Sequence, residues 1–111
     1  MKIIKLDAID STNSYLKRLL TKDSLDDLTV VVSKHQTKGK GRNGNIWENE
    51  ASLNLAFSIY KKFNNLDVKD KFMLNVISSL SVFQLLKENN LNKLTIKWPN
   101  DIMTGKEKIS G

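Results

Sequence analysis

The alternation of residues 53–60 restricts the fold more than any other pattern in this chain. Leu53, Leu55, Phe57 and Ile59 are separated by smaller or polar residues, and a period of two places these apolar side chains on one face of a β-strand. We expect that face to pack against the core. The opposite face is small and polar, so it either leaves room for a ligand or is simply the less buried side of an antiparallel sheet.

Helical and strand-like segments alternate along the rest of the chain. Residues 67–89 place apolar side chains on overlapping i, i+3 and i+4 rows, so we expect a long helix that is buried over much of its circumference. A shorter helix is expected from the capping residues 10–13 to about residue 22. Further strands are expected at residues 2–6, 29–33 and 94–98, and a final hairpin at residues 102–109 with Thr104 and Gly105 in its turn. These elements predict an α+β fold with two helices and a mixed, mainly antiparallel sheet.

Composition narrows the class of protein. The chain has 111 residues, of which 40% are hydrophobic and 27% are charged, which fits one globular domain with a modest core. It has no cysteine, which excludes disulfides and thiolate metal sites, and its single histidine, His35, excludes a multi-histidine metal cluster. No apolar run is long enough to span a membrane and the N-terminus does not resemble a signal peptide, so we expect a cytoplasmic protein.

Positive charge is concentrated in one part of the chain. The formal net charge is +6, and Lys34, Lys38, Lys40 and Arg42 follow one another with no acidic residue before Glu48. This favours an anionic partner: a nucleotide, an acidic small molecule or nucleic acid. A proteome biased toward lysine and asparagine is an alternative explanation for the overall excess.

The same region contains a glycine-rich segment, residues 39–47, with the sequence Gly-Lys-Gly-Arg-Asn-Gly-Asn-Ile-Trp. Glycine lets backbone N–H groups approach a ligand closely, and with lysine and arginine nearby such a run can form an anion-binding nest. Trp47 offers a flat surface on which a base can stack. On these residues alone, a phosphate or nucleotide loop is as well supported as a solvated hairpin connection.

Three separated motifs occur in a characteristic order. Residues 11–13 (Ser-Thr-Asn) begin the first helix, residues 36–47 (Gln-Thr-Lys followed by the glycine-rich segment) follow the second strand, and residues 97–101 (Lys-Trp-Pro-Asn-Asp) precede residues 108–111 (Lys-Ile-Ser-Gly). Each motif alone has a plain structural interpretation as a helix cap, strand-end polar residues, a core tryptophan, or a turn. Together they closely resemble the catalytic domain of biotin protein ligases, and the resemblance covers essentially the whole chain.

The resemblance implies a fold of the class II aminoacyl-tRNA synthetase and biotin ligase type, in truncated form. Residues 1–111 would be part of the catalytic domain, without the N-terminal DNA-binding domain of bifunctional members and without the C-terminal β-barrel domain. The implied reaction joins biotin to ATP, supplied with Mg²⁺, as biotinyl-5′-adenylate. Biotin then passes to a lysine of the biotin carboxyl carrier domain of acetyl-CoA carboxylase or a related carboxylase. The resemblance implies no nucleic-acid partner, no membrane and no metal held by protein side chains, and it is compatible with a homodimer.

The resemblance also assigns residues to roles. The implied catalytic residues are Lys108 and Arg42. The implied biotin-binding residues are Ser11, Thr12, Asn13, Gln36, Lys40, Gly41, Arg42 and Lys108. The implied nucleotide-binding residues are Gly39, Gly44, Asn45, Trp47, Asn100 and Asp101. The chain departs from the usual pattern at Lys40, where arginine is common, and at Asn43 and Asn45, where further basic residues are common, so we expect Arg42 to contribute more of the phosphate binding.

Three other functions stay open at this point. A lipoate-type ligase would use a similar carboxylate adenylation, although the motif at residues 97–101 and the glycine-rich segment argue against it. A non-catalytic fragment that only binds ligand would keep the same motifs. A basic nucleic-acid-binding module would explain the charge, but aromatic residues are only 7% of the chain and do not interleave with the cations, as a single-strand platform requires.

Overall fold

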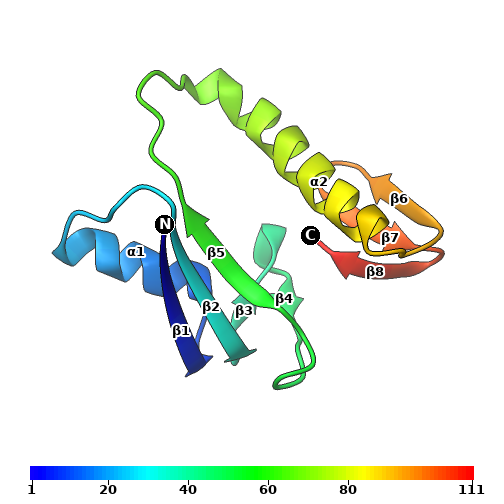
Figure 1. The fold of residues 1–111 in the computed structure, drawn as a ribbon, viewed down its shortest axis with the longest axis horizontal. Coiled ribbons are helices and arrows are strands. Elements are labelled where there is room, and N and C mark those ends of the chain that lie inside the picture. Colours follow the sequence, from blue (N-terminus) through cyan, green and yellow to red (C-terminus); the bar gives the residue numbers. More distant parts are fainter. The chain divides into compact units, whose positions relative to one another are not determined.

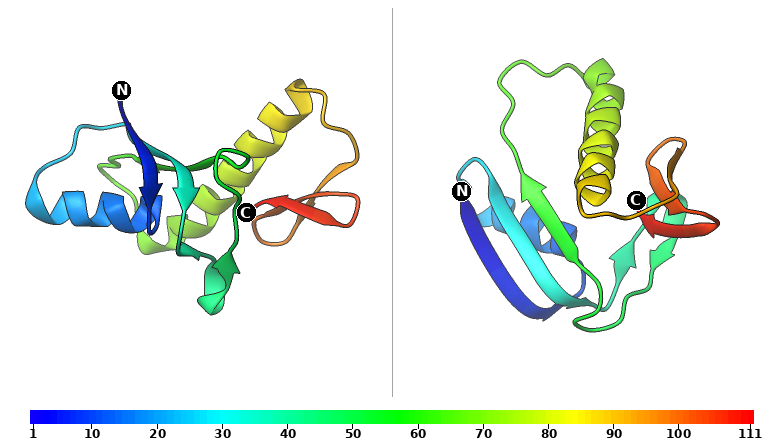
Figure 2. Two further views of the ribbon diagram at one scale, coloured as in Figure 1. Left: turned by 90° about the horizontal axis from the view of Figure 1, so that it is seen from below. Right: turned by 45° about the vertical axis from the view of Figure 1, so that its right-hand side comes forward.

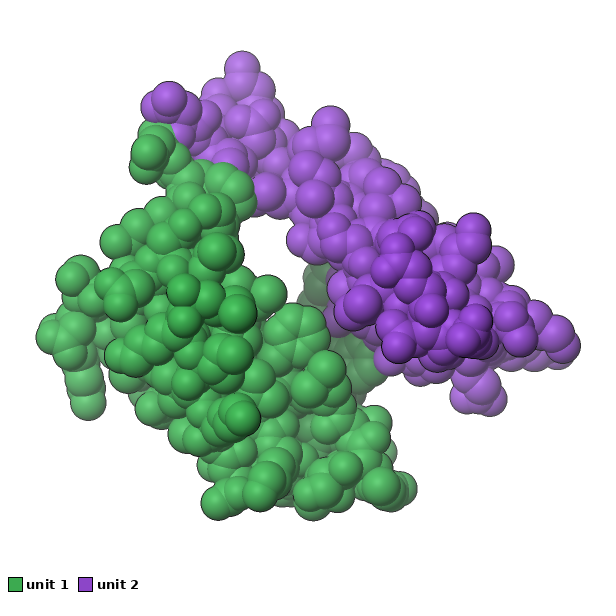
Figure 3. Space-filling model, in the orientation of Figure 1, with its two compact units in different colours: residues 1–64 green, residues 65–111 purple.

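The computed structural model describes residues 1–111 and divides them into two compact units, Met1–Asn64 and Asn65–Gly111. Figure 3 colours the two units separately. Each unit has one α-helix and one three-stranded sheet. The expected α+β fold with two helices and mostly antiparallel strands is confirmed.

Unit 1 is built on the sheet β1-β2-β5. Strands β1 (Lys2–Ile9) and β2 (Thr29–Gln36) pair in parallel, and β5 (Ala56–Tyr60) pairs antiparallel with β2 (Figure 1). Both β1 and β2 are longer than we expected at residues 2–6 and 29–33, because parallel pairing continues as far as Ile9 and Gln36. The extra length brings the end of β2 beside the start of the first helix.

Helix α1 (Thr12–Lys22) covers one face of this sheet and confirms the expected short helix (Figure 2). Ser11 is its N-cap, and its side chain accepts a hydrogen bond from the Ser14 backbone N–H, which satisfies a donor that the first turn leaves free. Leu16 of the helix packs with Leu25 and with Val31 of β2, the fully buried centre of the core.

Strand β5 is turned the other way from our expectation. It begins at Ala56, so the predicted strand start at residue 53 is wrong. Phe57 and Ile59 remain 44% and 54% exposed, whereas Ser58 and Tyr60 are the more buried side chains, and Tyr60 packs against the core. The face that we interpreted as the less buried side is therefore the inner face of unit 1. Ala56 and Ser58 on this face are small, and α1 packs against the strand there.

The glycine-rich segment forms a short hairpin. Strands β3 (Gly39–Lys40) and β4 (Ile46–Trp47) pair antiparallel, and a 3₁₀ turn, η1 (Arg42–Gly44), lies between them. Of the two interpretations left open, the hairpin connection is thus the one seen in the fold, which by itself leaves the function of the segment undecided.

Unit 2 packs one helix on a small antiparallel sheet. A 3₁₀ turn, η2 (Val68–Asp70), leads into α2 (Lys71–Glu88), and the sheet consists of β6 (Leu94–Lys97), β7 (Asp101–Thr104) and β8 (Glu107–Ser110). The long helix and the final hairpin are confirmed, but the hairpin turn consists of Gly105 and Lys106, and Thr104 instead ends β7. Gly105 has a φ of 57°, a conformation that glycine adopts readily. Neither helix of the protein combines the length and the apolar character needed to cross a membrane.

Helix α2 is less buried than we expected. Ser79 is its only buried residue, and Phe72, Met73, Ile77 and Leu80 are each more than half exposed. The prediction of burial over much of the circumference is wrong for unit 2 considered by itself. The physical reason is that the unit offers this helix only one small sheet to pack against, through β6 and β7.

Candidate functional site

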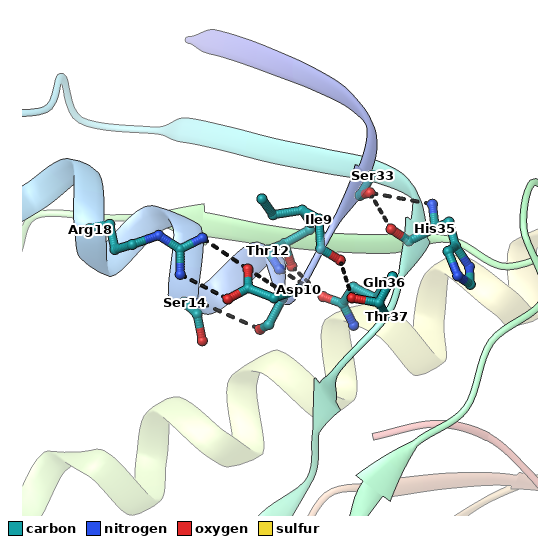
Figure 4. Close-up of polar contacts among 10 residues, drawn as sticks. Ile9, Asp10, Thr12, Ser14, Arg18, Ser33, His35, Gln36 and Thr37 are labelled. Carbon is teal, nitrogen blue, oxygen red and sulfur yellow. Dashed lines mark hydrogen bonds and ion pairs between the residues drawn. The ribbon is translucent and has the colours of Figure 1, made fainter.

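Polar residues meet where α1 begins and β2 ends. The parallel register pairs Ile9 with Gln36, and the chain continues the pairing beyond the strands: the Thr37 N–H donates to the Ile9 carbonyl at 2.9 Å and the Lys38 N–H to the Asp10 carbonyl at 2.7 Å. The start of the helix and the base of the hairpin are therefore held side by side. Figure 4 shows the hydrogen bond between Thr37 and Ile9, together with the contacts of Asp10, Thr12 and Gln36.

Thr12 and Gln36 form the centre of this cluster. Thr12 is only 2% exposed, and both its backbone N–H and its hydroxyl donate to Gln36 Oε1, at 2.8 and 3.0 Å. The Thr12 hydroxyl also lies 2.8 Å from the hydroxyl of Ser58 on β5. Buried polar groups are stable only when they are hydrogen-bonded, and these contacts across α1, β2 and β5 satisfy the Thr12 and Ser58 hydroxyls and Gln36 Oε1.

An ion pair holds the segment that leads into α1. Arg18 donates from Nη1 and Nη2 to the two carboxylate oxygens of Asp10, both at 2.9 Å, and the Ser11 N–H donates to Asp10 Oδ1 at 2.8 Å. The hydrogen bonds from Arg18, and then that from the Ser11 backbone, hold the pKa of the Asp10 carboxyl well below its usual range. Asp10 therefore stays ionised and anchors Ser11, while Asn13 is exposed on the first turn.

A cavity of about 770 Å³ opens at the end of β2. Its walls include Gln36, His35, Trp47 and Asn49, and the Asn49 side chain accepts a hydrogen bond from the Gln36 backbone N–H at 3.3 Å. The His35 Nδ1 atom is buried and has no hydrogen-bond partner. The cavity thus combines an indole ring with amide side chains, groups that suit a heterocyclic ligand.

The hairpin of β3 and β4 beside this cavity forms hydrogen bonds within its own backbone. The Gly41 N–H donates to the Asn45 carbonyl at 2.7 Å, and the Asn45 N–H donates to the Arg42 carbonyl at 3.1 Å. These amides are not turned toward a ligand, so the expected anion nest is correspondingly smaller. Lys40 and Arg42 are exposed, and so are Gly44 and Asn45. An anion would meet the cationic side chains first.

The remaining predicted residues lie in unit 2. Lys108 Nζ lies 2.9 Å from Asp101 Oδ1, an ion pair between neighbouring strands β8 and β7. Asn100 is half-buried just before β7. Trp98 is 70% exposed and packs against the Phe72 ring with a centroid separation of 5.2 Å. The interpretation of Trp98 as a core residue is therefore wrong for this unit.

The structure brings the predicted residues together in two groups. Thr12 and Gln36 are in direct contact in unit 1, with the hairpin beside them, and Asp101 and Lys108 are in contact in unit 2. The sequence did not identify Ser58 or the ion pair of Asp10 and Arg18. Ser58 did have a signal, because it belongs to the small polar face of the alternating strand. The ion pair had none, because it joins a loop residue to the second turn of a helix.

Comparison with known proteins is consistent with these observations. The model of the Biotin/lipoate A/B protein ligase family matches residues 6–111. The bifunctional ligase/repressor BirA of Salmonella typhimurium is 28% identical over 106 residues, which cover 96% of this chain and 32% of that protein. The biotin–[acetyl-CoA-carboxylase] ligase of Mycobacterium tuberculosis is 26% identical over 113 residues, covering 96% of this chain and 42% of that protein.

Solved structures give the same result. The biotin protein ligase of Aquifex aeolicus in complex with biotin and ATP superposes with a TM-score of 0.76 and 31% identity, covering 96% of this chain and 43% of that one. The biotin acetyl coenzyme A carboxylase synthetase of Helicobacter pylori with bound biotinylated ATP gives a TM-score of 0.70 and 29% identity, covering 96% of this chain and 51% of that one. The chain thus spans about half, or less, of the length of these relatives.

Proposed function

The chain belongs to the Biotin/lipoate A/B protein ligase family, and on that premise we propose that it is part of the catalytic domain of a biotin protein ligase. The domain attaches biotin to a lysine of a biotin carboxyl carrier domain through biotinyl-5′-adenylate, with ATP as the second substrate. The observation that most supports this proposal is the buried contact of Thr12 with Gln36 beside a cavity lined by Trp47. Hydroxyl and amide groups are what a buried urea ring requires.

The proposed reaction has two steps. The biotin carboxylate attacks the α-phosphorus of ATP, a phosphoanhydride bond breaks, and pyrophosphate leaves with its electron pair. The ε-amine of the carrier lysine then attacks the acyl carbon of the mixed anhydride; an amide forms, AMP leaves, and the amine loses a proton. The first step brings two anions together, so the site must supply fixed positive charge and hydrogen-bond donors.

We assign the side chains to these needs as follows. Thr12 and Gln36, with Ser11 and Asn13, bind the ureido end of biotin, because they are the polar residues at the start of α1 and the end of β2. Lys108 is the cation for the biotin carboxylate and the adenylate phosphate. In the structure it is paired with Asp101, so binding an anion would exchange or share that carboxylate contact.

The hairpin residues complete the proposed site. Lys40, Gly41 and Arg42 contact biotin and the phosphate of the adenylate, and Arg42 is the guanidinium that can bind a phosphate through two hydrogen bonds. The nucleotide is bound by the other residues that the motifs indicate, namely Gly39, Gly44, Asn45, Trp47, Asn100 and Asp101. We further infer that Mg²⁺ enters with ATP and that the carrier belongs to a biotin-dependent carboxylase. We also infer that the reaction takes place in the cytoplasm. A homodimer is one oligomeric state to test.

Calorimetric titration of the chain tests the proposal. We expect it to bind biotin, and to bind a non-hydrolysable biotinyl-adenylate analogue more tightly, because the analogue fills both halves of the site. Lipoate added in excess should not displace biotin. Displacement by lipoate would assign the chain to the lipoate branch of the family, and failure to bind either acid or the analogue would contradict the proposed function.

A further inference from the structure

The hydrogen bonds among Ser58, Thr12 and Gln36 have only one possible direction. A backbone N–H can only donate, so the Gln36 atom that lies 2.8 Å from the Thr12 nitrogen must be the amide oxygen, Oε1. The Thr12 hydroxyl lies 3.0 Å from the same oxygen and therefore uses its single proton there. At the 2.8 Å contact between the two hydroxyls, Ser58 must then be the donor and Thr12 the acceptor.

This direction determines which end of the Gln36 amide is available to a ligand. Oε1 already accepts two hydrogen bonds from Thr12, while both protons of Nε2 are left for other partners. Nε2 lies at the base of the hairpin: a Cβ atom placed on Gly39 would be 3.0 Å from it. Gln36 also lines the cavity at the end of β2. The amide therefore offers donors, and not an acceptor, on the side of the hairpin.

We propose that Ser58 is a positioning residue of the ligand site: the Thr12 N–H sets the orientation of the Gln36 amide, and Ser58, by directing the Thr12 hydroxyl at the same oxygen, helps to hold that amide with Nε2 toward the ligand, so that the site selects a neutral hydrogen-bond acceptor. This inference rests on the proposed function, in which the ureido carbonyl oxygen of biotin is such an acceptor. Ser58 itself does not need to touch the ligand. It supplies the proton that occupies the acceptor lone pair of Thr12 and so keeps the Thr12 hydroxyl directed at Gln36.

The position of Ser58 suits this role. It lies opposite Val31 in the register of β5 and β2, on the inner face of the sheet, where α1 packs. Hydrogen bonds in a chain of this kind polarise one another, so loss of the first donor weakens the next contact. An alanine at this position removes the hydroxyl and little volume, so the packing of Thr12 against the sheet is retained.

Two substitutions in the full chain separate positioning from packing. Ser58→Ala should raise the dissociation constant for biotin about three- to tenfold, the usual effect of losing one hydrogen bond. Gln36→Glu keeps an acceptor for Thr12 and removes the Nε2 donors, so it should fold and yet weaken biotin binding more than tenfold. Ser81→Ala, which removes a hydroxyl bonded to the Ile77 carbonyl on α2, is the matched control and should have no effect.

A double-mutant cycle then tests whether Ser58 affects biotin binding through Thr12. If Ser58 acts through Thr12, Ser58→Ala should have little further effect in a Thr12→Val background, whereas Thr12→Ser, which keeps the hydroxyl, should preserve the effect. An equal loss in both backgrounds would mean that Ser58 contacts the ligand itself, and unchanged affinity in Ser58→Ala would also overturn the proposal.

A second measurement does not depend on biotin. The side-chain NH₂ resonances of Gln36 should shift in Ser58→Ala and stay in place in Ser81→Ala, because only the first variant disturbs the hydrogen bond at Oε1. If wild-type protein fails to bind biotin, the proposed function is wrong, and these resonances still test whether Ser58 positions Gln36 through Thr12. An unshifted NH₂ pair in Ser58→Ala refutes that positioning role.

Discussion

Replacing Gly39 with alanine tests the geometry at the base of the hairpin. A Cβ atom on Gly39 would lie 2.7 Å from the Trp47 carbonyl oxygen and 3.0 Å from both Gln36 Nε2 and Trp47 Cβ. The first of these is a backbone atom in the pairing of β3 with β4, so it cannot rotate away. We expect the hairpin to open at its base, at a cost of about 1–3 kcal/mol, which is typical of overpacking.

Thermal unfolding and biotin titration together measure this effect. For a unit of this size, 1 kcal/mol lowers the melting temperature by roughly 4–8 °C, so Gly39→Ala should melt at least about 4 °C below wild type. Biotin binding should weaken as well, because the added methyl group displaces Gln36 Nε2.

The control is Gly44→Asn at the hairpin tip, where φ is 80° and an added Cβ would have no other atom within 4 Å. Asparagine tolerates such a conformation, so this variant should melt close to wild type. Wild-type melting and affinity in Gly39→Ala would refute the reasoning.

Three further predictions concern charge. Arg18→Ala should destabilise the protein at neutral pH, and this difference in stability from wild type should disappear in acid. The pKa of Asp10 is lowered in the folded state, so the stabilising effect of the ion pair is present above the unfolded pKa of about 4 and is lost as pH falls through the folded value. Urea unfolding of both proteins across this pH range measures the difference. Lys108→Ala should weaken binding of the biotinyl-adenylate analogue at least tenfold by calorimetry, and unchanged binding would remove Lys108 from the site. Arg42→Gly should release the same analogue faster in a stopped-flow chase, with Lys87→Ala, which removes an exposed cation from the last turn of α2, as a control that keeps the wild-type off-rate.

The parts of the fold that the sequence predicts well are those that depend on neighbours in the chain. Helix α1 starts at Thr12 because Ser11 caps it, and the β7–β8 hairpin turns at Gly105 because glycine adopts a positive φ. The ends of β1 and β2 were predicted too early, because polar residues such as Gln36 are extended only through parallel pairing with a distant strand. Pairing partners of that kind have no local signal.

The buried side of β5 was mispredicted. Alternation shows which residues share a face, but it does not show which face meets the rest of the unit. In β5 the inner face is the one with Ser58, because α1 needs small side chains for close approach and because Thr12 needs a hydroxyl partner. Phe57 is therefore left outside the core of unit 1. A strand whose apolar side chains face outward could not be recognised before the helix that covers its other face had been placed.

The candidate site shows the same limit at the level of chemistry. The motifs named Thr12 and Gln36 separately, as residues that a ligand would touch. Their contact with each other, and hence the orientation of the Gln36 amide, depends on Ile9 and Gln36 being neighbours in the parallel register. A motif can thus identify a glutamine as a ligand-binding residue, but whether that glutamine offers a donor or an acceptor is decided by the Thr12 N–H, which can only donate to Oε1. In our proposal Ser58, a residue that no motif includes, helps to hold that arrangement through the Thr12 hydroxyl.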